Sequence, residues 1–230
     1  MDLKIEFNSI CGKDHIESNQ NNQDAISVKS DNESCVIVLA DGAGSRKYAE
    51  MGAKRVSKAV AEFLYANISR IFLIDRKTLK QELYSLVKQE LFRLADEHNQ
   101  IGIREFGSTL LFAAVDKDTY IIGHLGDGTI MGCYKDSYPV LSFPETGPIK
   151  NSTILTTSFH AEKHLRIKKG KTLDLDGIIL LSDGIFPFLF EREYIRRYRE
   201  PLPVVLKRAE NENHIDDASY VSVVWREFYG

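Results

Sequence analysis

The chain has 230 residues, of which 43% are apolar and 27% are charged, and its formal net charge is −3. This balance is typical of a globular protein with one sizeable core, and it predicts a single domain over residues 1–230. The charge provides no basic excess for nucleic acid as the main partner. No apolar run approaches the roughly 18 residues that span a bilayer, and the first residues lack a signal-peptide pattern, so we expect a cytoplasmic protein with no membrane partner.

The first half of the chain predicts three strands followed by two long helices. The predicted strands lie at residues 3–10, 25–30 and 34–40. Asp31-Asn32 separates the second and third strands and is a hairpin signal. Apolar residues then recur three or four positions apart, which predicts helices at residues 45–68 and 75–99. Ser45 and Asp75 are the predicted N-caps of these two helices.

Apolar, strand-like runs predominate in the second half of the chain. They lie at residues 108–115, 119–125, 129–134, 178–181 and 219–225. A helix is predicted at residues 204–211, and the basic run 166–171 is typical of a polar hairpin. Strands therefore come first, two adjacent helices follow, and more strands come last. Because this order does not alternate as in a doubly wound parallel sheet, it predicts an α+β protein, an antiparallel sandwich with helices packed outside.

Aspartates follow or precede several of the predicted strands. Three Asp-Gly pairs each follow an apolar run, at Asp41, Asp127 and Asp183. Asp24 directly precedes the strand at residues 25–30, and Asp216-Asp217 precedes the last strand. A lone Asp-Gly pair is typical of a turn, and Asp127 is the one that a turn explains most easily. Several carboxylates on the ends of rigid strands are also the oxygen ligands that Mg²⁺ or Mn²⁺ needs, so both interpretations stay open here.

Six short motifs follow one another along the chain. They are Asn22-Gln23-Asp24-Ala25, Ala40-Asp41-Gly42-Ala43-Gly44, Gly107-Ser108-Thr109, Gly126-Asp127-Gly128, Ser182-Asp183-Gly184 and Asp216-Asp217-Ala218-Ser219. In this order they resemble the metal-dependent protein phosphatases of the protein phosphatase 2C type, in particular a small bacterial branch with Gln-Asp in the first motif. The resemblance runs from about residue 15 to residue 224. It implies a four-layer α-β-β-α sandwich, with two antiparallel sheets and a pair of helices on each outer face.

The resemblance also implies an activity, the hydrolysis of phosphoserine and phosphothreonine in proteins with two Mn²⁺ or Mg²⁺ ions. Asp41 would bridge the ions, and the Gly42 carbonyl would ligate the first. Asp183 and Asp216 would hold the second ion, and Asp24 would steady a metal-bound water. A metal-bound hydroxide would attack phosphorus without forming a phospho-enzyme.

The chain departs from the family pattern where phosphate and the leaving group should be contacted. The histidine that often follows the Asp-Gly pair is Ala43, which removes a candidate general acid. The arginine that often lies five positions before the first aspartate is Asn19. His15, Lys13 or Arg46 could replace that arginine as a phosphate-binding group, and we predict His15 and Arg46.

A further departure affects a possible third ion. In the family, two aspartates bind this ion. One is the aspartate of the Gly-Asp-Gly motif, and the other lies four residues after the aspartate of the Ser-Asp-Gly motif. Asp127 occupies the first position, but the second is Pro187, which has no side-chain ligand. The third ion is therefore in question, with Asp127 and Asp183 as the carboxylates that could still share it.

Two other functions remain open. A catalytically weak or inactive phosphatase-fold domain, acting as a protein interaction module, is favoured by Ala43, Asn19 and Pro187. A phosphatase that forms an aspartyl-phosphate on Asp41 would need a second aspartate at position 43, where alanine stands. If the chain is an active phosphatase, the resemblance implies a phosphoprotein substrate, with a partner kinase or the target of that kinase as a possible partner.

Overall fold

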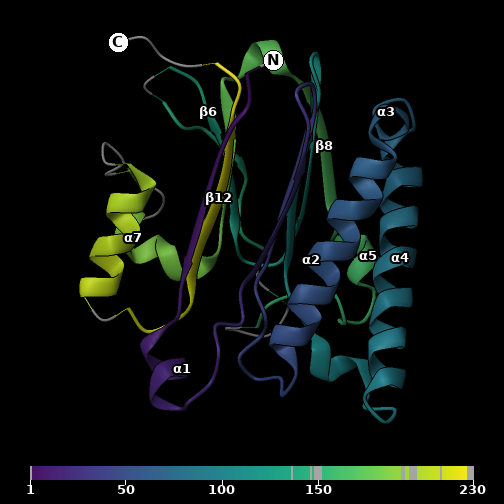
Figure 1. Cartoon of the computed structure of the whole chain (residues 1–230), viewed down its shortest axis with the longest axis vertical. Helices are drawn as coiled ribbons and strands as arrows, with labels where there is room; N and C mark the ends of the chain where they lie inside the picture. The colour runs from purple at the N-terminus through teal and green to yellow at the C-terminus, as the bar shows by residue number, and fades with distance from the viewer. Residues whose placement is uncertain are drawn as a thin grey trace.

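Two antiparallel five-stranded sheets form the centre of the protein (Figure 1). They are seen in a computed structural model that describes residues 2–135, 137–145, 147, 152–192, 195–196, 201–212 and 214–226. One sheet has the order β2 (Ala25–Ser30), β3 (Cys35–Ala40), β4 (Leu110–Val115), β5 (Thr119–Leu125) and β8 (Arg166–Lys171). The other has the order β1 (Lys4–Ile10), β12 (Ala218–Val224), β9 (Gly177–Leu181), β6 (Thr129–Cys133) and β7 (Val140–Ser142). A separate ribbon pairs β10 (Phe190–Arg192) with β11 (Ile195–Arg196).

The central strands are apolar at successive positions because both of their faces are covered. In β3, Ile37 and Leu39 belong to the cluster between the two sheets, whereas Val36 and Val38 belong to the cluster beneath the helices. Side chains of a strand alternate between faces, so a strand buried on both sides is apolar throughout. This explains why β3 and β4 are buried at every residue.

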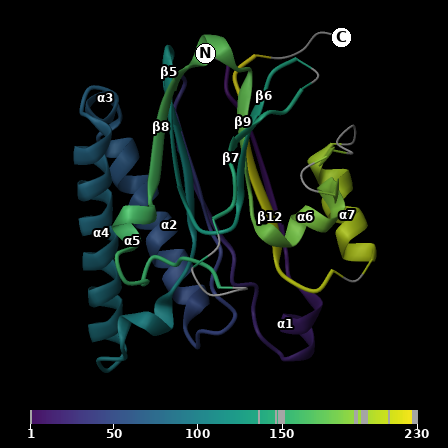
Figure 2. The ribbon, with the colours of Figure 1, turned by 180° about the vertical axis from the view of Figure 1, so that it is seen from behind.

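Helices cover both outer faces and complete four layers (Figures 1 and 2). The long helices α2 (Ala49–Ala66) and α4 (Arg76–Glu97) pack on the sheet that contains β3, and α7 (Leu202–Asn211) packs on the other sheet together with the short α6 (Phe186–Leu189). The remaining short helices are α1 (Lys13–Glu17), α3 (Ile68–Ile71), η1 (Ile103–Phe106), α5 (Ala161–His164), η2 (Thr172–Asp174) and η3 (Asp183–Ile185). The predicted α-β-β-α sandwich is confirmed, although α6 has only four residues where a full helix pair is implied.

The ends of the two long helices test the capping predictions. Asp75 is the N-cap of α4, since its side chain accepts hydrogen bonds from the backbone N–H groups of Lys77 and Thr78. The prediction of Ser45 as the N-cap of α2 is wrong. The helix begins at Ala49 after Tyr48, which makes no side-chain capping bond, because residues 43–47 turn toward the end of the sheet before the helix starts.

The basic run 166–171 is a strand and not the predicted hairpin. It pairs with β5 along its whole length, with His124 opposite Arg166 and Thr119 opposite Lys171. The Lys169 ammonium donates hydrogen bonds to the carbonyls of Ile71 and Phe72, beyond the edge of the sheet. The lysines therefore occupy an edge strand, where charged side chains oppose pairing with another chain.

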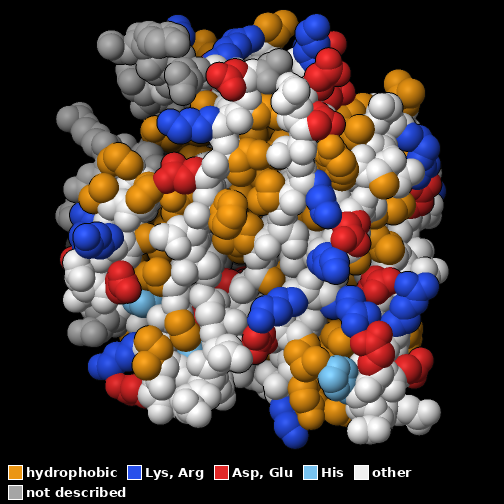
Figure 3. Space-filling view, in the orientation of Figure 1, with side chains coloured by type: hydrophobic (Ala, Val, Ile, Leu, Met, Phe, Trp, Pro, Cys, Tyr) orange, Lys and Arg blue, Asp and Glu red, His pale blue; other side chains and the backbone are white. Residues whose placement is uncertain are grey.

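On the face seen in Figure 3, Lys and Arg lie among Asp and Glu, particularly over α2 and α4. Arg55 is paired with Glu97 and Arg70 with Glu82. Within the part of the chain that the structure describes, no helix is both long and apolar enough to cross a bilayer.

Candidate metal centre

The strand-end aspartates meet at one end of both sheets because the strands are antiparallel. Ala25 pairs with Ala40, so Asp24 before β2 lies beside Asp41 after β3. In the other sheet Tyr220 pairs with Leu181, which brings Asp216 before β12 close to Asp183 after β9. Asp127 lies in the link between β5 and β6, from one sheet to the other. Five aspartates that are distant in sequence thus reach one end of the sandwich.

A cavity of about 370 Å³ opens at this end. Its wall contains four of the predicted aspartates, the loop after β3 and parts of two other loops. The lining residues are Asp41, Gly42, Ala43, Gly44, Ser45, Arg46, Thr109, Asp127, Ser152, Thr153, Leu155, Asp183 and Asp216. Carboxylate oxygens of Asp41, Asp127 and Asp183 lie within 4.8 Å of one another, which is close enough to share one cation.

Backbone contacts fix the segment that carries Asp41. The backbone N–H of Asp41 donates to Thr109 Oγ1 at 2.9 Å, and the Thr109 N–H donates to the Asp41 carbonyl at 2.8 Å. The Gly42 N–H donates to the Gln23 carbonyl at 3.2 Å, and a Cβ at position 42 would come within 2.8 Å of that oxygen. Glycine is therefore required at position 42 for a steric reason, and the close approach ties the motif of Asp24 to that of Asp41.

Burial and mutual repulsion perturb these carboxyl groups. Burial, followed by the neighbouring charges of Asp24 and Asp183, raises the pKa of Asp41 well above its usual range. Burial and the charges of Asp127 and Asp216 raise the pKa of Asp183 to about 6. Burial also raises the pKa of Asp216.

Asp24 is buried and is the most clearly unsatisfied member of the group. Burial raises its pKa to about 7, with contributions in the same direction from Asp217 and Asp183, and the nearby hydroxyls of Ser219 and Ser182 oppose this rise. Among the residues that the structure describes, neither carboxylate oxygen of Asp24 has a hydrogen-bond partner of normal geometry. Oδ1 of Asp183 is also buried without one.

Buried carboxylates that repel one another and lack donors are costly unless a cation compensates them. Oxygen-only donors at strand ends fit the hard divalent cations Mg²⁺ and Mn²⁺. The side chains present at this site thus fit a divalent metal centre.

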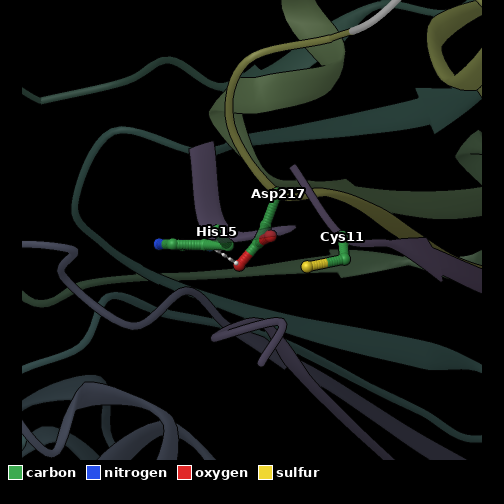
Figure 4. Close-up of side chains that lie close together, drawn as sticks. All are labelled: Cys11, His15 and Asp217. Atoms are coloured by element: carbon green, nitrogen blue, oxygen red, sulfur yellow. Dashed lines mark hydrogen bonds and ion pairs between the residues drawn. The ribbon is translucent and has the colours of Figure 1, made fainter. Parts of the chain in front are cut away.

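Asp217, next to Asp216, has the opposite environment (Figure 4). Its Oδ1 accepts the Gly12 N–H at 2.7 Å, and its Oδ2 accepts the Gln23 N–H at 2.6 Å and contacts His15 Nδ1 at 2.9 Å. Cys11 lies beside this pair, with its sulfur within 4.8 Å of the ligand atoms of both residues. Because N–H donors already satisfy the Asp217 carboxylate, we interpret it as the group that holds the loop of residues 11–23 against the site.

The structure separates the two predicted phosphate-binding residues. Arg46 lines the cavity, and its Nε is buried without a hydrogen-bond partner. His15 lies behind Gly44, with Nε2 at 3.9 Å from the position that a Cβ of Gly44 would take. Asn19 adopts a positive φ of 53° and lines a neighbouring cavity of about 510 Å³, whose wall also includes Arg46.

The structure also locates Ala43 and Pro187, the two other residues that differ from the family pattern. Ala43 lines the main cavity and brings no polar side chain to it. Pro187 lies in α6, where it adds no ligand to the group of Asp127 and Asp183.

Sequence reasoning assigned no role to Asp217, Thr109 or Thr153. The Thr153 hydroxyl donates to Asp127 Oδ2. The adjacent Asp216-Asp217 was a usable signal, since two neighbouring carboxylates can point in different directions and serve different roles. Nothing in the local sequence indicates Thr153, because its loop reaches Asp127 only through the tertiary fold.

A sandwich of two sheets with buried, unsatisfied carboxylates at one end fits a class of protein that binds divalent cations at that end. A profile of the protein phosphatase 2C family matches residues 11–218. The chain therefore belongs to the protein phosphatase 2C family, and the predicted class of enzyme, a protein phosphatase, is confirmed with it. Among curated protein sequences, none matches this chain.

Solved structures share the fold at low sequence identity. The serine/threonine phosphatase Stp1 from Staphylococcus aureus has a TM-score of 0.71 at 16% identity, covering 99% of this chain and 96% of that one. The catalytic domain of the serine/threonine phosphatase PstP, solved with 2 manganese ions, has a TM-score of 0.66 at 15% identity, covering 96% and 97%. PppA, a regulatory component of T6SS in Pseudomonas aeruginosa, has a TM-score of 0.67 at 16% identity, covering 96% and 97%.

Proposed function

We propose that this chain acts as a single phosphatase domain that hydrolyses phosphoserine and phosphothreonine in proteins, using two Mn²⁺ or Mg²⁺ ions. The observation that carries the proposal is the cluster of buried carboxylates in which, among the described residues, both oxygens of Asp24 and Oδ1 of Asp183 lack hydrogen-bond partners. Membership of the protein phosphatase 2C family supports the reaction class. A phosphoprotein is the proposed substrate, and a kinase or the target of that kinase is the proposed partner.

Asp41, Asp183, Asp216 and the Gly42 carbonyl would hold the two ions. The oxygens of Asp41, Asp127 and Asp183 within 4.8 Å support Asp127 as an additional ligand and leave room for a third ion. Divalent ions held by these residues would lower the pKa of water and neutralise charge on the phosphoryl group. The buried carboxylate of Asp24 would accept a hydrogen bond from the attacking water and so orient it.

Arg46 and His15 would contact the phosphate. Arg46 reaches the cavity wall and keeps a buried Nε donor free, and a guanidinium binds phosphate oxygens through several N–H groups. Thr109 and Gly42 would keep the Asp41 carboxylate at a fixed distance from that phosphate, because their backbone bonds hold the start of the loop.

The test is phosphate release from a phosphoserine peptide by the full-length protein, first treated with a chelator and then titrated with Mn²⁺. We expect turnover only with Mn²⁺, and a loss of at least about 100-fold in Asp41→Asn, because that carboxylate contributes to the charge balance of the centre. Absence of turnover on phosphopeptides and aryl phosphates at saturating Mn²⁺ would contradict the proposal, and so would a trapped phosphate ester on Asp41.

The second candidate is a phosphatase-fold domain that binds partners without efficient catalysis. It is favoured by Ala43, which leaves the cavity without a histidine, and by Pro187, which removes a carboxylate. Mn²⁺ binding without turnover in the same experiment would favour this candidate.

A further inference from the structure

The His15 ring is held at one nitrogen by a buried carboxylate (Figure 4). Nδ1 lies 2.9 Å from Asp217 Oδ2, and the two side chains are 13% and 3% exposed. Asp217 is itself fixed by the N–H groups of Gly12 and Gln23, at 2.7 and 2.6 Å. A carboxylate that accepts from Nδ1–H sets the tautomer and the orientation of an imidazole. The ring therefore presents Nε2 in a defined direction.

Nε2 of His15 lies on the side of the ring away from Asp217, close to Gly44 (Figure 4). It makes no hydrogen bond with any residue that the structure describes, and it is not enclosed. It faces Gly44, a residue of the cavity wall, from the side on which a Cβ would stand. Because glycine has no side chain, no Cβ of residue 44 occupies the space in front of Nε2.

Cleavage of a serine or threonine phosphate needs a proton donor. The departing alkoxide is strongly basic, so proton transfer to it lowers the barrier by a factor of about 10² to 10⁴. Arg46 does not release its proton near neutral pH, and Ala43 has none to give. The His15 imidazole, next to the wall residue Gly44, has two ring nitrogens that can each hold a transferable proton.

We propose that the imidazolium form of His15, which carries a proton on each nitrogen, donates its Nε2 proton to the leaving oxygen, with Asp217 as its positioning residue. The inference rests on the proposed phosphatase function. The bond between phosphorus and the seryl oxygen breaks, and the oxygen keeps the electron pair and takes the Nε2 proton. Water supplies the new oxygen on phosphorus and releases one proton to solvent, and neutral His15 regains one proton from solvent. The products are a serine hydroxyl and inorganic phosphate.

The decisive variant is His15→Gln, measured on two substrates in the full-length protein with Mn²⁺. Glutamine places an amide N–H near the position of Nε2, so it retains a hydrogen-bond donor without a transferable proton. We expect kcat for a phosphoserine peptide to fall about 100-fold, with a smaller change in KM. For p-nitrophenyl phosphate, whose phenolate leaves without protonation, we expect a fall of less than about tenfold.

Two further variants separate proton transfer from structure. Asp217→Asn should produce the same substrate dependence with a smaller amplitude, because the imidazole remains but its orientation is lost. Turnover of the peptide by His15→Gly should rise on addition of imidazole, which refills the space with a proton donor. His160→Gln, at an exposed histidine bonded to Glu162, is the matched control and should leave both substrates unaffected.

Equal losses on the peptide and on p-nitrophenyl phosphate, or a loss confined to KM, would overturn the proposal and leave His15 with phosphate binding alone. No loss in His15→Gln would also overturn it. Failure of the wild-type protein to turn over either substrate would instead contradict the phosphatase function, so the two failures are distinguishable.

Discussion

The two ends of the sheet that contains β3 and β4 carry aspartates in similar sequence positions but opposite environments. At one end Asp116, directly after β4, accepts the N–H groups of Asp118 and Thr119 at 3.0 and 2.8 Å. Asp31 does the same for Glu33 and Ser34, each at 2.8 Å. At the other end Asp24 is buried, and its carboxylate has no such donors.

The comparison separates two uses of one residue type. An aspartate whose oxygens accept backbone N–H groups stabilises a turn, and its charge is compensated locally. An aspartate that is buried without donors, beside other carboxylates, needs a cation. The number of N–H partners, and not the position at a strand end, therefore distinguishes the metal centre from the turns.

The largest expected effect is at Asp183. Asp183→Asn should lower both the affinity for Mn²⁺ and the turnover of a phosphopeptide by at least about 100-fold, because a ligand charge is removed from the centre. Isothermal titration with Mn²⁺ and a phosphate-release assay measure the two effects. Asp116→Asn is the matched control at the other end of the sheet, and an equal loss there would refute the distinction.

The pH dependence of stability sharpens the comparison in the metal-free protein. Asp24 and Asp183 have folded-state pKa values of about 7 and about 6. Since both values lie above the unfolded value of about 3.9, the folded state holds extra protons, and the free energy of unfolding should fall as the pH rises from about 4 to about 7.

In Asp24→Asn the free energy of unfolding should decrease less as the pH rises from about 4 to about 7. The variant should therefore stabilise the metal-free protein at pH 8 by on the order of 2 kcal/mol. Thermal unfolding in a chelator at a series of pH values measures it. Saturating Mn²⁺ should flatten the profile of the wild-type protein, and a chelated protein whose stability rises with pH over this range would contradict the expectation.

Asp217 should behave as a structural carboxylate despite its place beside Asp216. In Asp217→Asn an amide NH₂ meets the N–H of Gly12 or Gln23, which should reduce the free energy of unfolding by about 2–3 kcal/mol. Urea denaturation measures this loss. Asp31→Asn provides the comparison, because its carboxylate is exposed to water and its loss should cost less stability than Asp217→Asn.

The smallest expected effect concerns the support of Asp41. Thr109→Val removes the hydroxyl that accepts the Asp41 N–H and should cost about 1 kcal/mol of stability. Turnover should decrease only a few-fold, because the Thr109 N–H still donates to the Asp41 carbonyl. Urea denaturation and the phosphate-release assay test both statements, and a loss as large as that of Asp183→Asn would show that Thr109 takes part in the reaction.

Periodicity predicted the elements whose signal is local. The helix α4 was predicted from the spacing of its apolar residues, and its N-cap from the aspartate at position 75. Both predictions depend only on contacts between residues a few positions apart. The start of α2 did not, because the segment from Gly42 to Tyr48 is held by the carbonyls of Gln23, Gly107 and Glu105. The strand β8 was missed for a similar reason, since its lysines form a strand only through pairing with β5.

By itself the sequence determined the class of fold and the set of carboxylates. Apolar runs ending in aspartates, in a fixed order, depend on residue type alone. Only the tertiary structure decided which aspartates lack donors, that Asp217 holds His15 while Asp216 lines the cavity, and that Arg46 lies in the wall with His15 behind Gly44. The physical reason is that hydrogen-bond satisfaction and burial are set by segments that are remote in sequence, here residues 11–24, 41–46, 107–109 and 214–219.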